Sequence, residues 1–202
     1  MGLNSSSMLQ DQDVEDIKKE TGFSEKQIKR LYIRFLHLDS RGCGRLSRED
    51  FGRIPELAIN PLNERIIDSF YFHCSDIDEQ EGCNFREFMK TLAHFRRCSK
   101  RGQNPLNTEE EKLKFIFSIY DIDKDGNITK ADLLKILEMM VGVSIGKEQL
   151  ELIAHRTIQD ADADSDDAID FEEFKKVHIE KYTSLNSGAN LASYMQGRFS
   201  MG

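Results

Sequence analysis

The sequence predicts an all-α protein built from EF-hand pairs: two lobes, each with two helix–loop–helix hands and a short β pairing between its loops. The first observation is a fourfold recurrence of a helix-like stretch, an acidic loop and a second helix-like stretch. The second is the spacing, because the first two loops are separated by almost the same distance as the last two. The third is amphipathic periodicity beside the loops. The loops begin at Asp39, Asp76, Asp121 and Asp162.

Length and composition indicate a globular protein that attracts cations. Of the 202 residues 39% are hydrophobic, which is enough to bury two small cores. Asp and Glu number 36 against 28 Lys and Arg, and the net charge of -8 argues against nucleic acid as a partner. No apolar run approaches the roughly 20 residues that cross a bilayer. The four cysteines show no CxxC spacing, so we expect reduced thiols rather than a zinc site.

The chain divides into five regions. Residues 1–20 form an N-terminal segment, residues 21–95 the N-terminal lobe, and residues 111–181 the C-terminal lobe. Residues 96–110 contain Gly102, Pro105 and Asn107, which interrupt the apolar periodicity, so we expect a linker there. Residues 182–202 are rich in Ser, Gly and Asn, so we expect a flexible tail, with folding back as a lid as the alternative.

The N-terminus carries an N-myristoylation pattern. The chain begins MGLNSS, which presents Gly2 for acylation and Ser6 as the small hydroxyl residue. One acyl chain gives only marginal membrane binding, so a second contact is required. A basic cluster after the second hand is a candidate for that contact, and a solvated linker is the other interpretation. The cluster consists of Arg96, Arg97, Lys100 and Arg101.

Apolar residues recur at helical spacing before the first loop and after the third. We expect these side chains to form the cores of the two lobes. The alternative is that some of them line a groove for a helix of another protein. The first stripe consists of Ile28, Leu31, Tyr32, Phe35 and Leu38, and the second of Leu133, Leu134, Ile136, Leu137, Met140 and Val141.

The first loop lacks the chemistry of a calcium site. An EF-hand loop presents oxygen ligands at positions 1, 3, 5, 7, 9 and 12. Here Arg41 stands at position 3 and Cys43 at position 5. We therefore expect a structural hand in which Leu46 pairs with Cys83 of the second loop.

The second loop offers an oxygen at every ligand position but departs from the pattern elsewhere. Glu81 replaces the favoured turn Gly, and residues 71–75 are inserted between the helix and the loop. We expect this loop not to bind a cation, with binding as the alternative. Its nominal ligands are Asp76, Asp78, Gln80, Gly82, Asn84 and Glu87.

The third loop supplies a nearly complete set of calcium ligands. Gly126 occupies the turn position, whereas Asp132 stands at position 12, where Glu is usual. Because Asp is one methylene shorter, bidentate contact is harder, and we expect six-coordinate, Mg2+-tolerant binding. The ligands are Asp121, Asp123, Asp125, Asn127 through its carbonyl, Thr129 and Asp132.

The fourth loop ends in a full-length Glu and is expected to be the tighter Ca2+ site. Asp167 stands at the turn position, and Asp enters the left-handed region at modest cost. Ile128 and Ile169, both at position 8, are expected to pair between the third and fourth loops. The ligands of this second site are Asp162, Asp164, Asp166, Ala168, Asp170 and Glu173.

Catalytic chemistry is not indicated. The five histidines are dispersed along the chain, and no nucleophile with a base or open metal site is apparent. We expect a non-enzymatic protein.

Four short runs are informative: TGFS at 21–24, LSREDF at 46–51, IPELAINPL at 54–62 and TLAHFR at 91–96. Together they resemble the calcineurin B homologous proteins, and the resemblance extends over about residues 2–174. DKDG at 123–126 and MMVG at 139–142 are shared more widely, including with calcineurin B itself. The runs TGFS and LAHFR favour the homologous proteins. The chain departs from the family in an insertion around 71–82 and in its ending after Val177.

The resemblance implies a calcium-binding regulatory adaptor whose cation sites lie in the C-terminal lobe. Its implied partner is an amphipathic juxtamembrane helix of a plasma-membrane sodium/proton exchanger, held in a hydrophobic groove. A calcineurin B-like regulatory subunit of a protein phosphatase is the alternative, and a calcium buffer is the third. The implied location is cytoplasmic and peripheral at the plasma membrane. Nuclear shuttling through an export segment at 133–141 is a further implication, although core is the main interpretation of that stretch.

Overall fold

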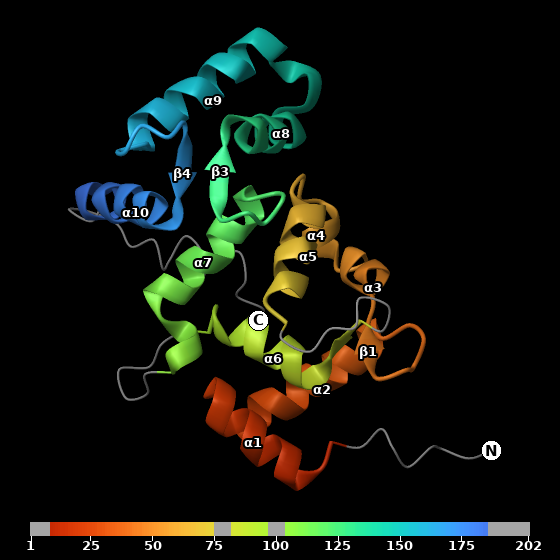
Figure 1. The fold of residues 1–202 in the computed structure, drawn as a ribbon. Coiled ribbons are helices and arrows are strands. Elements are labelled where there is room, and N and C mark those ends of the chain that lie inside the picture. Colours follow the sequence, from red (N-terminus) through yellow and green to blue (C-terminus); the bar gives the residue numbers. More distant parts are fainter. Residues whose placement is uncertain (1–8, 75–81, 97–103, 186–202) are drawn as a thin grey trace. The chain divides into compact units, whose positions relative to one another are not determined.

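The computed structural model describes residues 9–74, 82–96 and 104–185 (Figure 1). The chain forms two compact units, Met1–Phe115 and Ile116–Gly202. The structure is mainly helical with two short antiparallel strand pairs, and this confirms the predicted fold class. In the described ranges, no helix combines the length and apolar character needed to cross a membrane.

The first unit contains two helix–loop–helix hands preceded by an additional helix. β1 and β2 pair antiparallel, with Leu46 opposite Cys83, which confirms the predicted pairing. The elements in chain order are α1 (Asp11–Thr21), α2 (Glu25–Leu38), β1 (Arg45–Leu46), α3 (Arg48–Gly52), α4 (Pro55–Ala58), α5 (Asn63–Phe72), β2 (Cys83–Asn84), α6 (Phe85–Ala93) and the 3-10 turn η1 (Pro105–Asn107).

Aromatic side chains of α2 and α6 form the core of this unit. Phe35 is buried and makes edge-to-face contacts with Phe85 and Phe88. Ile28 is also buried, so the core prediction is confirmed for these two members of the α2 stripe. The remaining members, Leu31, Tyr32 and Leu38, are partly exposed.

α1, which begins within the predicted N-terminal segment 1–20, belongs to the first unit and packs against its other helices. Val14 and Ile17 are buried, and α1 lies against α2 and α6. Gly22 ends α1 with a left-handed φ of 68°. The Arg96 guanidinium donates to the Gly22 carbonyl, and a Cβ at Gly22 would lie 3.0 Å from that guanidinium. The helix end is thereby fixed to the C-terminal side of α6.

The described part of the predicted linker also bonds within the first unit. The Asn104 amide donates to the carbonyl of Glu20 over 2.9 Å. The Asn107 amide donates to the carbonyl of Arg96 over 2.5 Å. Both asparagines are buried, so these residues are held by side-chain hydrogen bonds rather than by an apolar stripe.

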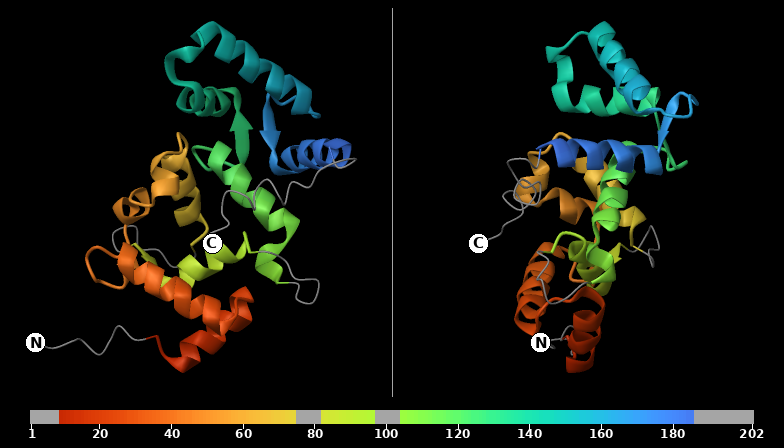
Figure 2. Two further views of the ribbon diagram at one scale, coloured as in Figure 1. Left: turned by 180° about the vertical axis from the view of Figure 1, so that it is seen from behind. Right: turned by 90° about the vertical axis from the view of Figure 1, so that its left-hand side faces the viewer.

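The second unit contains the second pair of hands. β3 and β4 pair antiparallel with Ile128 opposite Ile169, as predicted. α8 and α9 pack side by side (Figure 2). The elements are α7 (Glu109–Tyr120), within which the two units divide, β3 (Asn127–Thr129), α8 (Lys130–Val141), the turn η2 (Gly142–Ser144), α9 (Lys147–Ala161), β4 (Ala168–Asp170) and α10 (Phe171–Leu185).

The core prediction for α8 is confirmed for Leu133 and Ile136 and is wrong for Met140 in the last turn. Leu133 and Ile136 are buried, whereas Leu134, Leu137 and Val141 are partly exposed. Met140 is 51% exposed. The apolar periodicity runs to the end of α8, but in this last turn the packing no longer covers the side chain.

Candidate metal centre

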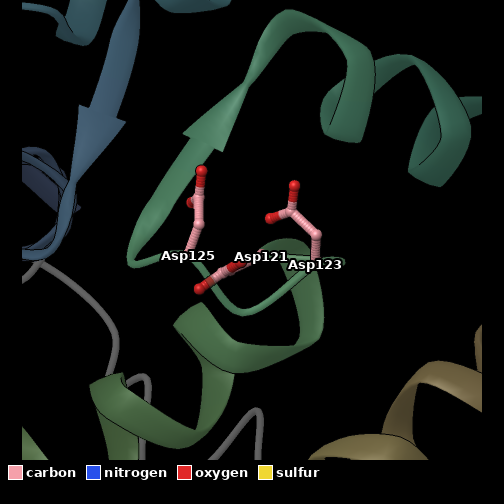
Figure 3. A group of neighbouring side chains, drawn as sticks. All are labelled: Asp121, Asp123 and Asp125. Atoms are coloured by element: carbon pink, nitrogen blue, oxygen red, sulfur yellow. The ribbon is translucent and has the colours of Figure 1, made fainter.

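The third loop gathers three carboxylates between the end of α7 and the start of β3. Ligand oxygens of Asp121, Asp123 and Asp125 lie within 4.8 Å of one another (Figure 3). Asp121 is buried and the other two are exposed. Such a donor set of hard oxygens fits a divalent cation of the Ca2+ or Mg2+ type.

Backbone donors hold the first carboxylate of this loop in place. Asp121 accepts hydrogen bonds from the backbone N–H groups of Lys124 (2.8 Å) and Gly126 (3.1 Å). Lys124 and Gly126 both adopt positive φ values, which curl the chain so that these N–H groups point inward. Asp125 accepts from the N–H of Asn127 over 2.8 Å. The tight turn is therefore formed by the residues of the loop itself.

Asp132, the predicted position-12 ligand, serves as a helix cap in the structure. Its Oδ2 accepts from the Thr129 hydroxyl (2.6 Å) and from the Thr129 N–H (3.0 Å). In return the Thr129 hydroxyl accepts from the Asp132 N–H, so the two residues form the capping box of α8. Asp132 stands outside the group of three carboxylates at the loop start.

The fourth loop repeats the arrangement with three further carboxylates. Ligand oxygens of Asp162, Asp164 and Asp166 lie within 4.8 Å of one another. Asp167 adopts a φ of 66°, which confirms the predicted left-handed turn without glycine. Its N–H donates to Asp162 over 2.9 Å. The turn thereby orients the first ligand in the same way as Gly126 does in the third loop.

Glu173 reaches across the fourth loop, unlike Asp132 in the third. Its Oε1 accepts from the N–H of Ala163 (2.6 Å), at the second position of the loop. Its Oε2 accepts from the N–H of Asp170 (3.0 Å), and the Asp170 carboxylate accepts from the Glu173 N–H (2.8 Å). With one extra methylene, the Glu173 carboxylate caps the helix through Oε2 and also reaches the start of the loop through Oε1.

The charges of the fourth loop repel one another. The carboxylate of Asp166 is the main cause of a raised pKa at Asp164, with smaller contributions from burial and from Glu173 and Asp162. For Asp162, burial acts to raise the pKa, but N–H donors from Asp167, Ser165 and Asp166 outweigh it and lower the pKa. A bound divalent cation would relieve this repulsion.

The predicted carbonyl ligands lie in the paired strands. Asn127 stands opposite Asp170, and Thr129 opposite Ala168, in the β3–β4 register. The β3–β4 pairing therefore joins the two loops at their predicted ligand positions 7 and 9.

The first loop is closed by protein donors. Asp39 accepts from the N–H of Gly44 over 2.6 Å, and Asp50 accepts from the hydroxyls of Ser40 (2.6 Å) and Ser47 (2.7 Å). Arg41, at position 3, forms an ion pair with Glu49. These contacts fit a structural hand.

Of the second loop, only the last part is described. Asn84 caps α6 by accepting from the N–H of Glu87 (3.0 Å), and Glu87 forms an ion pair with Lys90 (2.7 Å). Several residues of other predictions also lie outside the described ranges: Gly2, Asp76, Asp78, Gln80, Glu81, Arg97, Lys100, Arg101 and tail residues 186–202.

Comparisons with known proteins agree on one family. Residues 110–177 match the EF-hand domain pair. The chain is 43% identical over 176 residues to the calcineurin B protein of Naegleria gruberi, covering 87% of this chain and 92% of the relative. It is 42% identical to the type 1 calcineurin B protein of Dictyostelium discoideum, covering 85% and 88%. It is 36% identical over 200 residues to the type 2 protein of the same organism, covering 98% of both chains.

Proposed function

Because the chain belongs to the calcineurin B family of EF-hand proteins, we propose that it is a calcium-binding regulatory subunit of a protein phosphatase. In this role it performs no catalysis itself and binds an amphipathic helix of the catalytic subunit. The observation that carries the proposal is similarity to calcineurin B proteins over most of the chain.

A sodium/proton exchanger helix is the second candidate partner. It is favoured by the short runs at 21–24, 46–51, 54–62 and 91–96. These runs lie in the first unit and cover a small part of the chain, whereas the similarity to calcineurin B proteins extends through both units. We therefore place the phosphatase first.

Two cation sites serve this function. One is formed by the third loop and the other by the fourth, and Ca2+ is the proposed cation at both. The short Asp132 and its role as a helix cap support Mg2+ tolerance at the third-loop site. The reach of Glu173 to Ala163 supports tighter Ca2+ binding at the fourth.

Exposed apolar side chains of the second unit support a partner helix as the ligand. Large apolar side chains on a monomer's surface usually mark an interaction site when several occur together. Cation binding by a sensor hand reorients its helices and uncovers such side chains, so occupancy would control partner affinity. They are Met139 and Met140 of α8, Leu152 and Ile153 of α9, and Ile179 of α10.

Acylation at Gly2 would hold the complex at the membrane. One acyl chain binds a bilayer only marginally, so the partner or the basic residues 96–101 would supply the second contact. We propose a cytoplasmic, peripheral location on this basis. Nuclear shuttling through residues 133–141 would require Leu133 and Ile136, which are buried, to become exposed.

Affinity capture of the tagged full-length protein from its own cells, in Ca2+ or in chelator, tests the proposal. Ca2+-dependent recovery of a phosphatase catalytic subunit supports it. Recovery of a sodium/proton exchanger instead would transfer the function to the second candidate. Recovery of neither partner would favour the third interpretation, a calcium buffer.

A pair of variants shows whether the apolar side chains bind the partner. Ile153→Glu replaces one of these apolar side chains by a charged one and should weaken capture. Gln12→Glu is the control, since it adds the same charge at an exposed position of α1 in the first unit. Equal capture by both variants would remove this surface from the proposal.

A further inference from the structure

Two buried thiols of the first unit lie in contact. The Sγ atoms of Cys74 and Cys83 are 3.7 Å apart. Their side chains are 7% and 0% exposed, and both cysteines are free. Cys43, the remaining described cysteine, is exposed and its Sγ contacts the Asp39 carboxylate instead.

The backbone around Cys83 is held rigidly. Cys83 pairs with Leu46 in the β1–β2 ladder. Gly82 approaches so closely that a Cβ there would lie 2.5 Å from the Leu46 carbonyl oxygen. The same oxygen accepts a 2.7 Å hydrogen bond from the Tyr71 hydroxyl. The start of β2 and the end of α5 therefore both contact the Leu46 carbonyl oxygen.

Cys74 lies just after α5, and its side chain points towards Cys83. Its Sγ lies 3.2 Å from the Phe70 carbonyl and 3.7 Å from the Thr91 hydroxyl of α6. Three elements thus converge on the sulfur pair. A disulfide has an S–S length of about 2.05 Å, so bond formation requires the two sulfurs to approach by rotation and a small shift.

We propose that Cys74 and Cys83 are a redox-active dithiol that a hydroperoxide converts into an intramolecular disulfide. The bond would link the end of α5 to β2 and enclose residues 75–82. Those residues include the start of the second loop, so the modification acts on the second hand of the first unit.

The reaction balances with the hydroperoxide as sole oxidant. The Cys74 thiolate attacks the peroxide oxygen, the O–O bond breaks, and a sulfenic acid forms with release of water or an alcohol. The Cys83 sulfur then attacks the Cys74 sulfur, the S–O bond breaks, and a second water leaves with the Cys83 proton. Two thiols are oxidised by two electrons, and the peroxide is reduced.

The order of the two cysteines follows from their surroundings. Cys74 is the more exposed residue of the pair, at 7% against 0%, so a hydroperoxide reaches its sulfur more readily. Cys74 is therefore the nucleophile and Cys83 the resolving thiol.

A metal is a poorer explanation of the pair. The ligand groups of three or more side chains found in the described part of the chain comprise only aspartates of the third and fourth loops. Two thiols alone fall short of the four ligands of a structural zinc site.

Peptide mapping of the full-length protein tests the proposal directly. The tryptic peptide 66–86 contains both cysteines, no other cysteine, and no internal Lys or Arg. After hydrogen peroxide treatment and alkylation, we expect this peptide to carry no alkyl groups. Its mass should be lower than that of the reduced, unalkylated peptide by two hydrogen atoms. Dithiothreitol should restore double alkylation. Because this measurement uses the wild-type protein, it does not depend on whether a cysteine variant folds.

Variants in a Cys43→Ser, Cys98→Ser background identify the role of each sulfur. Cys83→Val, which keeps a small apolar side chain in β2, should leave Cys74 as a sulfenic acid that dimedone traps. The disulfide should also raise the thermal midpoint of the parent protein, because it restricts the unfolded chain. Oxidation of the exposed Cys43 in the wild-type protein shows that the peroxide treatment was effective. If peptide 66–86 is still doubly alkylated under that treatment, the proposal is wrong. Oxidation of both sulfurs to sulfinic acids without a disulfide would also overturn it.

Discussion

Ile128 and Ile169 stand opposite each other in the β3–β4 pairing, and their side chains are only 1% and 4% exposed. Each occupies position 8 of its loop, directly between the carboxylates and the exit helix. The contact joins the two cation loops through their backbones and through a shared apolar core. A change of geometry in one loop is therefore transmitted to the other.

Replacement of Ile169 by Ala should destabilise the second unit by about 3 kcal/mol, since it leaves a cavity in a closely packed core. It should also weaken Ca2+ binding at both loops, because the pairing that joins them loosens. Denaturant unfolding and Ca2+ titration measure the two effects. Leu152→Ala, at a side chain 48% exposed, is the control and should cost much less. Unchanged third-loop affinity in Ile169→Ala would contradict the coupling.

Lengthening Asp132 should change the selectivity of the third-loop site. In Asp132→Glu the carboxylate can extend past Thr129 towards the loop start, as Glu173 does in the fourth loop. We expect the preference for Ca2+ over Mg2+ to rise by about tenfold, which corresponds to about 1.4 kcal/mol. Competitive isothermal titration measures it. An unchanged ratio would mean that position 12 does not control selectivity.

Removal of the Glu173 charge should eliminate one Ca2+ site. Glu173→Gln loses the carboxylate that is expected to bind the fourth-loop cation through both oxygens, while the carboxylates of the third loop are untouched. Equilibrium dialysis should then give one high-affinity Ca2+ per chain in place of two. Glu172→Gln, at the neighbouring exposed position of α10, is the control and should retain both. Two intact sites in Glu173→Gln would show that the ligand is elsewhere.

The ion pair between Glu20 of α1 and Arg86 of α6 predicts a pH dependence. The Arg86 side chain donates to the Glu20 carboxylate and lowers the pKa of Glu20 below its ordinary 4.5. Because the folded-state pKa is depressed, the pair stabilises the protein above 4.5, and that stability is lost as the pH falls through the lowered pKa.

Glu20→Gln should therefore cost about 0.5 kcal/mol near neutral pH, the magnitude of a partly exposed pair. The difference from wild type should vanish in acid. Urea unfolding near neutral pH and in acid measures the difference in the free energy of unfolding, with Arg86→Gln as the reciprocal variant. A cost that persists in acid would assign the effect to packing rather than to charge.

Local patterns of the EF-hand loop could be predicted from the sequence. The pairing of Ile128 with Ile169, the pairing of Leu46 with Cys83, and the left-handed Asp167 all follow from position within a short repeated unit. The clustering of aspartates at each loop start follows from the same spacing, because the turn itself brings alternate residues together.

Relations between distant segments could not be predicted in this way. The burial of Val14 and Ile17 depends on α6, which lies far along the chain, and the bond of Arg96 to Gly22 joins residues with no shared pattern. The exposure of Met140 was missed because helical periodicity does not reveal where the covering residues end. The Cys74–Cys83 contact was missed because the two cysteines match no recognised spacing.

Reconstitution of the purified chain with a purified phosphatase catalytic subunit of the calcineurin type tests the central claim most directly. We expect a one-to-one complex by size-exclusion chromatography, with Ca2+-dependent stimulation of phosphatase activity that Glu173→Gln diminishes and Glu172→Gln retains. Failure to form a complex at any Ca2+ concentration, with both cation sites occupied, would contradict the account.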